Sequence, residues 1–100
     1  MPYATPLTEP EIVAALLTVP DWRREGDWLV RTVERPSFRS SIALVAAVAD
    51  AAEAADHHPD IEISWRRVTF RLTTKAAKAL TAKDVAMAAS IDRLAAEAER

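Results

Sequence analysis

The sequence predicts an α+β fold in one domain, residues 1–100, with three helices packed on one face of a four-stranded antiparallel sheet. Segments with helical apolar spacing alternate with pairs of segments in which apolar and polar residues alternate, in the order α-β-β-α-β-β-α. A chain of 100 residues suits one domain. The other face of the sheet is then left to solvent or to a second subunit.

The first helix is predicted to begin after Thr8. Glu11 stands three residues further on, as in a capping box, and Pro10 occupies a position where no helical donor is needed. Pro20 ends this helix by Val19, because proline disfavours helical geometry in the residue before it. Two strands, 21–25 and 28–34, follow around a turn and form a hairpin in which two tryptophans, Trp22 and Trp28, are expected to pack against the helices.

The second helix is expected to be capped by Ser37 and to end near the two histidines. Its predicted buried face has helical spacing and comprises Phe38, Ile42, Val45, Ala49 and Ala52. Leu44 and Val48 lie off that stripe, so the helix is apolar on more than one side. A helix of this kind must bury both sides, and we therefore expect it to contact a partner subunit.

Two half-buried antiparallel strands and a third helix complete the prediction. Ile61, Ile63 and Trp65 face one way along residues 60–65, and the second strand alternates in the same manner over residues 68–73. Trp65 is expected to be a core or interface residue of this sheet face. A capping-box-like pattern from Thr81 to Asp84 starts the last helix, with Asp84 as a capping residue. Its predicted apolar face comprises Val85, Ala88, Ile91, Ala95 and Ala98.

Composition excludes several classes of function. The chain has no cysteine, which removes disulfides, thiol catalysis and thiolate metal sites together. The net charge of −2, with acids and bases interspersed, gives no basic footprint for direct nucleic-acid binding. No apolar stretch is long enough to cross a membrane, and the first residues lack the composition of a signal peptide. We therefore expect a cytoplasmic protein.

The residues best suited to chemistry are the only two histidines, His57 and His58. Histidine exchanges a proton near neutral pH, and Glu53, four residues before His57, is placed to orient that ring. Pro59 stiffens the exit from the helix and holds the two rings in different directions. The pair is therefore a candidate acid–base couple, although two histidines at a helix end are also typical of a solvated terminus. A metal site is not expected, because no further histidine or cysteine completes a zinc shell.

The run Glu53-Ala54-Ala55-Asp56-His57-His58-Pro59, followed by Trp65 and Asp84, resembles the motif of the pterin-4a-carbinolamine dehydratases. The resemblance spans nearly the whole chain, with further matches at Leu7-Thr8, Trp22, Gly26, Phe38, Leu72-Thr73-Thr74 and Leu80-Thr81. There is one departure from the family's pattern. The family's third histidine, at the end of the fourth strand, falls here on Lys75, and Ala76 and Ala77 stand where small residues follow it.

The resemblance implies a hydro-lyase that removes water from 4a-hydroxytetrahydropterin and gives quinonoid dihydropterin, which regenerates the cofactor of aromatic amino acid hydroxylases. No metal or organic cofactor is implied. By the same likeness, His57 and His58 are the acid–base pair, Glu53 supports them, and Pro59 belongs to the pocket. The segment Thr74, Lys75, Ala76 and Ala77 lines the opposite side. Protonated Lys75 donates hydrogen bonds but accepts none, so it is expected to weaken catalysis.

The resemblance also implies an alternative without catalysis. Relatives bind homeodomain transcription factors as dimerisation cofactors, and a bacterial branch is associated with Rubisco assembly. Lys75 favours such an interaction module, whereas the intact run from Glu53 to Pro59 favours the enzyme. The family forms dimers and tetramers, so a homodimer or homotetramer is expected in either case.

Overall fold

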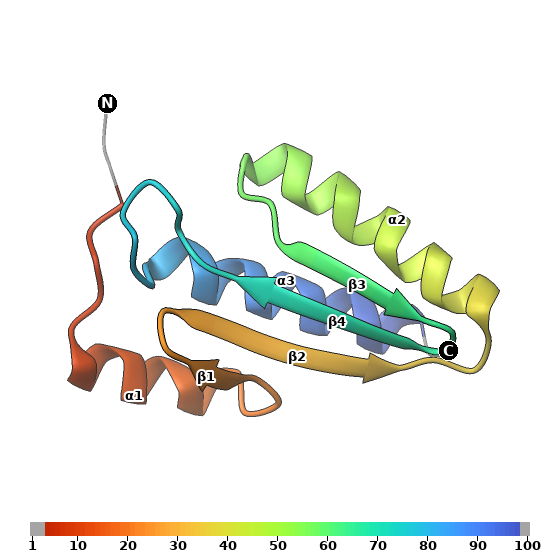
Figure 1. The fold of residues 1–100 in the computed structure, drawn as a ribbon, viewed down its shortest axis with the longest axis horizontal. Coiled ribbons are helices and arrows are strands. Elements are labelled where there is room, and N and C mark those ends of the chain that lie inside the picture. Colours follow the sequence, from red (N-terminus) through yellow and green to blue (C-terminus); the bar gives the residue numbers. More distant parts are fainter. Residues whose placement is uncertain (1–3, 99–100) are drawn as a thin grey trace.

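The computed structural model describes residues 4–98, so residues 1–3, part of the segment inspected for a targeting signal, lie outside the description. The predicted order of elements is confirmed (Figure 1). The elements are α1 (Glu9–Thr18), β1 (Arg23–Glu25), β2 (Trp28–Glu34), α2 (Phe38–Ala55), β3 (Asp60–Ser64), β4 (Arg67–Leu72) and α3 (Ala82–Ala98). Within residues 4–98, no helix is long and apolar enough to span a membrane.

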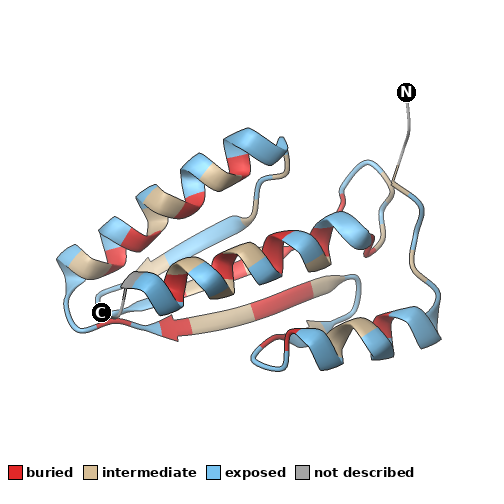
Figure 2. Cartoon of the chain, turned by 180° about the vertical axis from the view of Figure 1, so that it is seen from behind, coloured by how far each residue is buried: buried red, intermediate tan, exposed pale blue. Residues whose placement is uncertain are grey.

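The four strands form one antiparallel sheet in the order β1-β2-β4-β3. In the centre, Leu29 pairs with Leu72 and Val33 with Val68, so these four buried side chains share the face that packs on the helices. α2 and α3 contact each other and lie across this face, whereas α1 packs beside α3 near the start of β2 (Figure 1). Figure 2 shows buried and exposed residues alternating along α2 and α3.

The capping predictions for the first two helices are confirmed. Thr8 and Glu11 form a reciprocal capping box, in which the backbone N–H of Thr8 donates to Oε1 of Glu11 over 2.7 Å. This backbone hydrogen bond is the main reason that the pKa of Glu11 lies below its ordinary value. Ser37 caps α2, and its side chain accepts from the backbone N–H of Ser40.

The buried face of α2 is not the predicted one. Of the predicted residues, Ala52 is buried and Val45 is half-buried, whereas Phe38, Ile42 and Ala49 are exposed. Leu44 and Val48 are buried instead. The helix is thus rotated about its axis relative to the prediction, which places Ser41 in the interior. There its hydroxyl donates to the carbonyl oxygen of Trp65 over 2.9 Å. A buried polar residue with a backbone partner interrupts the apolar pattern, so the spacing favoured the wrong stripe. The helix is nevertheless apolar on two sides, as predicted.

Of the two positions expected for Trp65, core or interface, the core is wrong. Ser64 pairs with Arg67, so β3 and β4 are joined by a turn of only two residues, Trp65 and Arg66. Trp65 takes a left-handed backbone conformation, with φ 53°, and 67% of it is exposed, so it is not a core residue. The guanidinium of Arg66 lies 4.4 Å from the centre of its ring.

The remaining packing predictions hold for most residues. Trp22 is buried, and its Nε1 donates to Oδ1 of Asp92 on α3 over 2.7 Å, which fixes the hairpin to that helix. Trp28 is only half-buried. On α3, Ala88, Ile91 and Ala95 are buried and Val85 is half-buried, while the side chain of Ala98 lies outside the description.

Replacement of Leu44 by alanine tests the revised face of α2. Leu44→Ala removes a fully buried side chain and should lower the free energy of unfolding by about 2–5 kcal/mol in urea denaturation. Leu17→Ala, a matched change at an exposed leucine of α1, should cost less than about 1 kcal/mol. Equal costs for the two variants would contradict the assignment.

Candidate active site

The carboxyl end of α2 sends its two histidines in different directions. Asp56 ends the helix in a left-handed conformation, with φ 51° and ψ 44°, and the backbone N–H of His57 bonds to the carbonyl oxygen of Ala52 over 3.1 Å. Pro59 follows directly and β3 begins at Asp60. The reversed chain directs His57 toward α3, while His58 stays beside α2.

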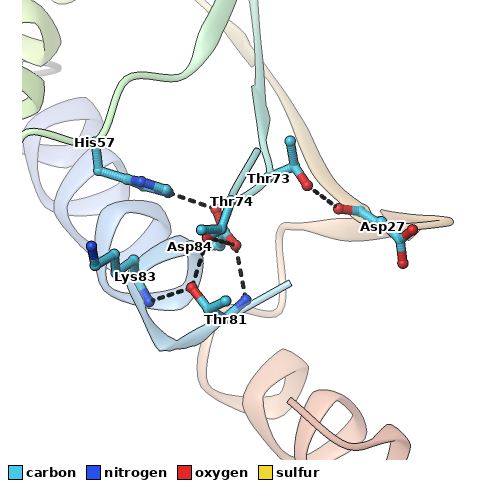
Figure 3. A network of polar contacts seen from close by, with 7 residues as sticks. All are labelled: Asp27, His57, Thr73, Thr74, Thr81, Lys83 and Asp84. Carbon is cyan, nitrogen blue, oxygen red and sulfur yellow. Dashed lines mark hydrogen bonds and ion pairs between the residues drawn. The ribbon is translucent and has the colours of Figure 1, made fainter. Parts of the chain in front are cut away.

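His57 is held by a buried carboxylate that arrives from another helix. Its Nε2 lies 2.7 Å from Oδ1 of Asp84, in the first turn of α3 (Figure 3). The side chain of Asp84 is 0% exposed and that of His57 11% exposed. The imidazole is therefore fixed against the protein interior by a short contact between residues 27 positions apart.

The other oxygen of Asp84 has two further partners. Oδ2 accepts the backbone N–H of Thr81 over 2.9 Å and the hydroxyl of Thr74 over 2.8 Å (Figure 3). The Thr81 contact is the capping interaction that the sequence predicts. The contact with His57 was not predicted, and the only signal for it was the position of Asp84 in the family motif.

His58 has the carboxylate that was expected beside His57. Its Nε2 lies 2.5 Å from Oε2 of Glu53, and the two side chains are 54% and 76% exposed. The prediction that Glu53 orients His57 is therefore wrong. Helical spacing of four residues requires the helix to continue, but Asp56 leaves the helical conformation one residue before His57. Because Asp56 is left-handed, the chain turns there and Glu53 contacts His58 instead of His57.

A cleft of about 370 Å³ opens between the histidines and the end of β4. It is lined by Asp56, His57, His58, Thr73, Thr74, Lys75, Ala76 and Lys83. Of the predicted pocket residues, Pro59 and Ala77 do not line it. Asp56, Thr73 and Lys83 were missed, although Asp56 and Lys83 immediately precede His57 and Asp84 in the sequence.

Lys75 stands on the opposite wall, at the solvent-exposed rim. Its Nζ lies 3.3 Å from Oδ1 of Asp60, the first residue of β3, and both side chains are largely exposed. The short segment around it is held in place, because Thr74 and Ala79 bridge through their backbones. Thr73 is fixed as well, since its hydroxyl donates to the carbonyl oxygen of Asp27 over 2.6 Å (Figure 3).

The cleft offers proton exchange at two imidazoles and a cationic donor across from them. Each imidazole has one nitrogen on a carboxylate, which leaves the other nitrogen for a ligand or for solvent. Among residues 4–98, no group of three or more histidine, aspartate or glutamate side chains is arranged to hold a metal ion.

The two histidine–carboxylate pairs should differ in their effect on stability. His57→Ala removes a partner of buried Asp84 and should lower the free energy of unfolding by about 1–3 kcal/mol. His58→Ala disrupts an exposed pair and should cost less than about 1 kcal/mol. Urea denaturation of both variants checks this, and a larger cost for His58→Ala would contradict the described burial.

The fold and the site together define a small α+β protein in which the two histidines of a His-His-Pro turn line a cleft. A sequence model described as pterin 4 alpha carbinolamine dehydratase matches residues 5–94. The chain therefore belongs to the pterin-4a-carbinolamine dehydratase family.

Sequence relatives agree with this membership. A Nocardia farcinica protein provisionally named pterin-4-alpha-carbinolamine dehydratase is 53% identical over 89 residues, which cover 89% of this chain and 94% of the relative. A protein of Roseiflexus sp. with the same provisional name is 48% identical over 91 residues, covering 91% of this chain and 98% of the relative.

Two solved structures resemble the fold. A transcriptional coactivator/pterin dehydratase from Brucella melitensis superposes with a TM-score of 0.88 at 28% identity, covering 91% of this chain and 99% of that one. A pterin dehydratase-like protein identified as a RuBisCO assembly factor in the alpha-carboxysome gives a TM-score of 0.66 at 27% identity, with 75% and 89% covered. The family thus includes proteins described by catalysis and proteins described by their partners.

Proposed function

We propose that the protein is a hydro-lyase that converts 4a-hydroxytetrahydropterin into quinonoid dihydropterin in the cytoplasm, and so serves tetrahydropterin recycling. The observation that carries the proposal is the placing of two carboxylate-bound imidazoles, His57 and His58, on one wall of a cleft with Lys75 on the other.

The reaction needs two proton transfers and no change in oxidation state. One imidazolium donates a proton to the 4a-hydroxyl, and the C4a–O bond breaks as water leaves. The other imidazole accepts the proton of N5, and the electrons of the N5–H bond form the N5=C4a double bond. One proton is given and one is taken, so a final exchange through solvent restores both rings. We therefore propose that no metal or organic cofactor takes part.

The cleft suits this substrate in size and chemistry. Its volume of about 370 Å³ lies at the small end of the range for ligand sites, as a two-ring heterocycle requires. Glu53 and Asp84 each occupy one ring nitrogen and so orient the other for proton transfer. Two imidazoles that leave the helix in different directions can reach two different atoms of one bound ring.

Lys75 is assigned a binding role instead of the proton transfer of a third imidazole. Its ammonium group donates hydrogen bonds and carries positive charge, which suits the pterin carbonyl or the departing oxygen. The contact with Asp60 is exposed and contributes little to stability, so the side chain is free to turn toward a ligand.

Rates of 4a-hydroxytetrahydropterin dehydration test the proposal. His57→Ala and His58→Ala should each lower kcat by roughly 10²–10⁴-fold, the usual contribution of one acid–base group. Lys75→Ala should act mainly on KM, whereas Lys75→His, which restores the family's third imidazole, should raise kcat. No rate above buffer for the wild-type protein at high concentration would refute the proposed activity.

A second candidate function is that of a non-catalytic interaction module. The observation that favours it is the exposure of Phe38 and Ile42 on α2 and of Trp65 in the turn between β3 and β4. Phe38, Arg39 and Ile42 border a hollow of about 200 Å³ on the surface. Large exposed apolar side chains mark contact surfaces, and both solved relatives are described by roles that involve other macromolecules.

We propose that this face of α2 joins copies of the chain in a homodimer or homotetramer. Phe38→Glu and Ile42→Glu should then reduce the mass measured by light scattering at micromolar concentration toward that of one chain. Leu17→Glu, at an exposed leucine of α1, should leave the mass unchanged. A wild-type mass of 11.0 kDa would contradict the assembly.

A further inference from the structure

We propose that Thr74 and Thr81 are positioning residues that fix the tautomer of His57. The Thr74 hydroxyl and the Thr81 backbone N–H hold Asp84, and the Thr81 hydroxyl orients that of Thr74. His57 then carries its proton on Nε2 and keeps Nδ1 free to accept one. The use of that nitrogen in dehydration rests on the proposed function, but the tautomer itself does not. Thr74 lines the cleft, as expected of a substrate-binding residue, and its hydroxyl is engaged inside the protein.

The direction of each hydrogen bond follows from counting protons. The backbone N–H of Lys83 donates to Oγ1 of Thr81 over 3.2 Å, and Oγ1 of Thr81 lies 2.7 Å from Oγ1 of Thr74. A hydroxyl has one proton to donate. Thr74 donates its proton to Oδ2 of Asp84, so Thr81 must donate its own to Thr74.

The same count of protons identifies the donor in the contact between His57 and Asp84. Ionised Asp84 only accepts, and Oδ2 already receives the backbone N–H of Thr81 and the Thr74 hydroxyl. Its Oδ1 therefore accepts from Nε2 of His57 over 2.7 Å, and Nε2 must carry a proton. In the neutral ring, Nδ1 is then the nitrogen with the lone pair.

Nδ1 of His57 is open to solvent. It makes no hydrogen bond to residues 4–98, and in that part of the chain no buried polar side-chain atom lacks a partner. His57 lines the main cleft and also a smaller hollow of about 150 Å³ between α2 and α3. A base at this position needs an accessible lone pair and a fixed ring. The buried hydroxyls, acting through Asp84, fix the ring.

The hydrogen-bonded network of Thr74, Thr81 and Asp84 is buried. Thr81 and Asp84 are fully buried and Thr74 nearly so, so water is not available to replace a lost hydroxyl without rearrangement. Asp84 is thereby held from three directions, by Thr74 at the end of β4, by Thr81 before α3 and by His57 after α2 (Figure 3).

The tautomer can be measured by ¹⁵N NMR of the imidazoles, because the chain has only two histidines and His58→Gln assigns their signals. We expect Nε2 of His57 to be protonated and Nδ1 not. In Asp84→Asn the amide oxygen stays toward Thr74 and Thr81, so the NH₂ group faces His57 and should move the proton to Nδ1. Addition of 7,8-dihydrobiopterin should shift the Nδ1 signal of the wild-type protein.

Thr74→Val removes the hydroxyl and keeps the shape. It should give a mixture of His57 tautomers, lower kcat about 10–100-fold, leave KM within a few-fold and displace the pH dependence of kcat. Thr74→Ser should restore the tautomer, kcat and the pH dependence. The control is Thr32→Val, which removes one hydroxyl from the Thr32–Thr69 pair, 2.8 Å apart on neighbouring strands and separate from the Asp84 network. It should leave the tautomer and kcat unchanged.

Three results would overturn the inference: a proton on Nδ1 in the wild-type protein, an unchanged tautomer in Thr74→Val, or equal effects of Thr74→Val and Thr32→Val on kcat. A wild-type protein without dehydratase activity but with the expected tautomer changes would refute the proposed function and support the positioning role.

Discussion

The buried carboxylate of Asp84 is the contact on which the site depends. Burial of a polar group without hydrogen bonds costs several kcal/mol, so Asp84 must collect donors from every element around it. It binds the end of β4 through Thr74, the start of α3 through Thr81 and the residue after α2 through His57. The hydrogen bonds that buried Asp84 requires hold these three segments together. One of them also orients the imidazole of His57 beside the cleft.

The two histidines therefore lie in contrasting surroundings. His57 is fixed by a network inside the protein, whereas His58 and Glu53 form a pair surrounded by water. A rigid ring is suited to accept a proton at one defined position. A solvated ring can exchange protons with water quickly and so return to its starting state. The divergence that makes this division possible comes from one left-handed residue, Asp56, followed by Pro59.

The sequence predicts what local patterns determine and fails where tertiary contacts decide. Capping residues such as Thr8 and Ser37 act within four positions, so their pattern predicted the helix starts. The buried face of α2 depends on Ser41, whose partner is a carbonyl oxygen 24 residues away. The partner of Glu53 depends on the left-handed conformation of Asp56, which helical spacing does not include. The cleft itself was predicted through family resemblance, while Lys83 and the contact between His57 and Asp84 required the structure.

The contrast between the two pairs also bears on whether the fold serves catalysis or assembly alone. Thr74, Thr81 and Asp84 have a structural reason to be present, because they close the start of α3. His58 and Glu53 have none of comparable strength, since an exposed ion pair contributes about 0–1 kcal/mol. A scaffold gains almost nothing from placing an imidazole and a carboxylate together at the mouth of a cleft. An acid–base enzyme needs that arrangement, and for this reason the exposed pair argues for catalysis more strongly than the buried one.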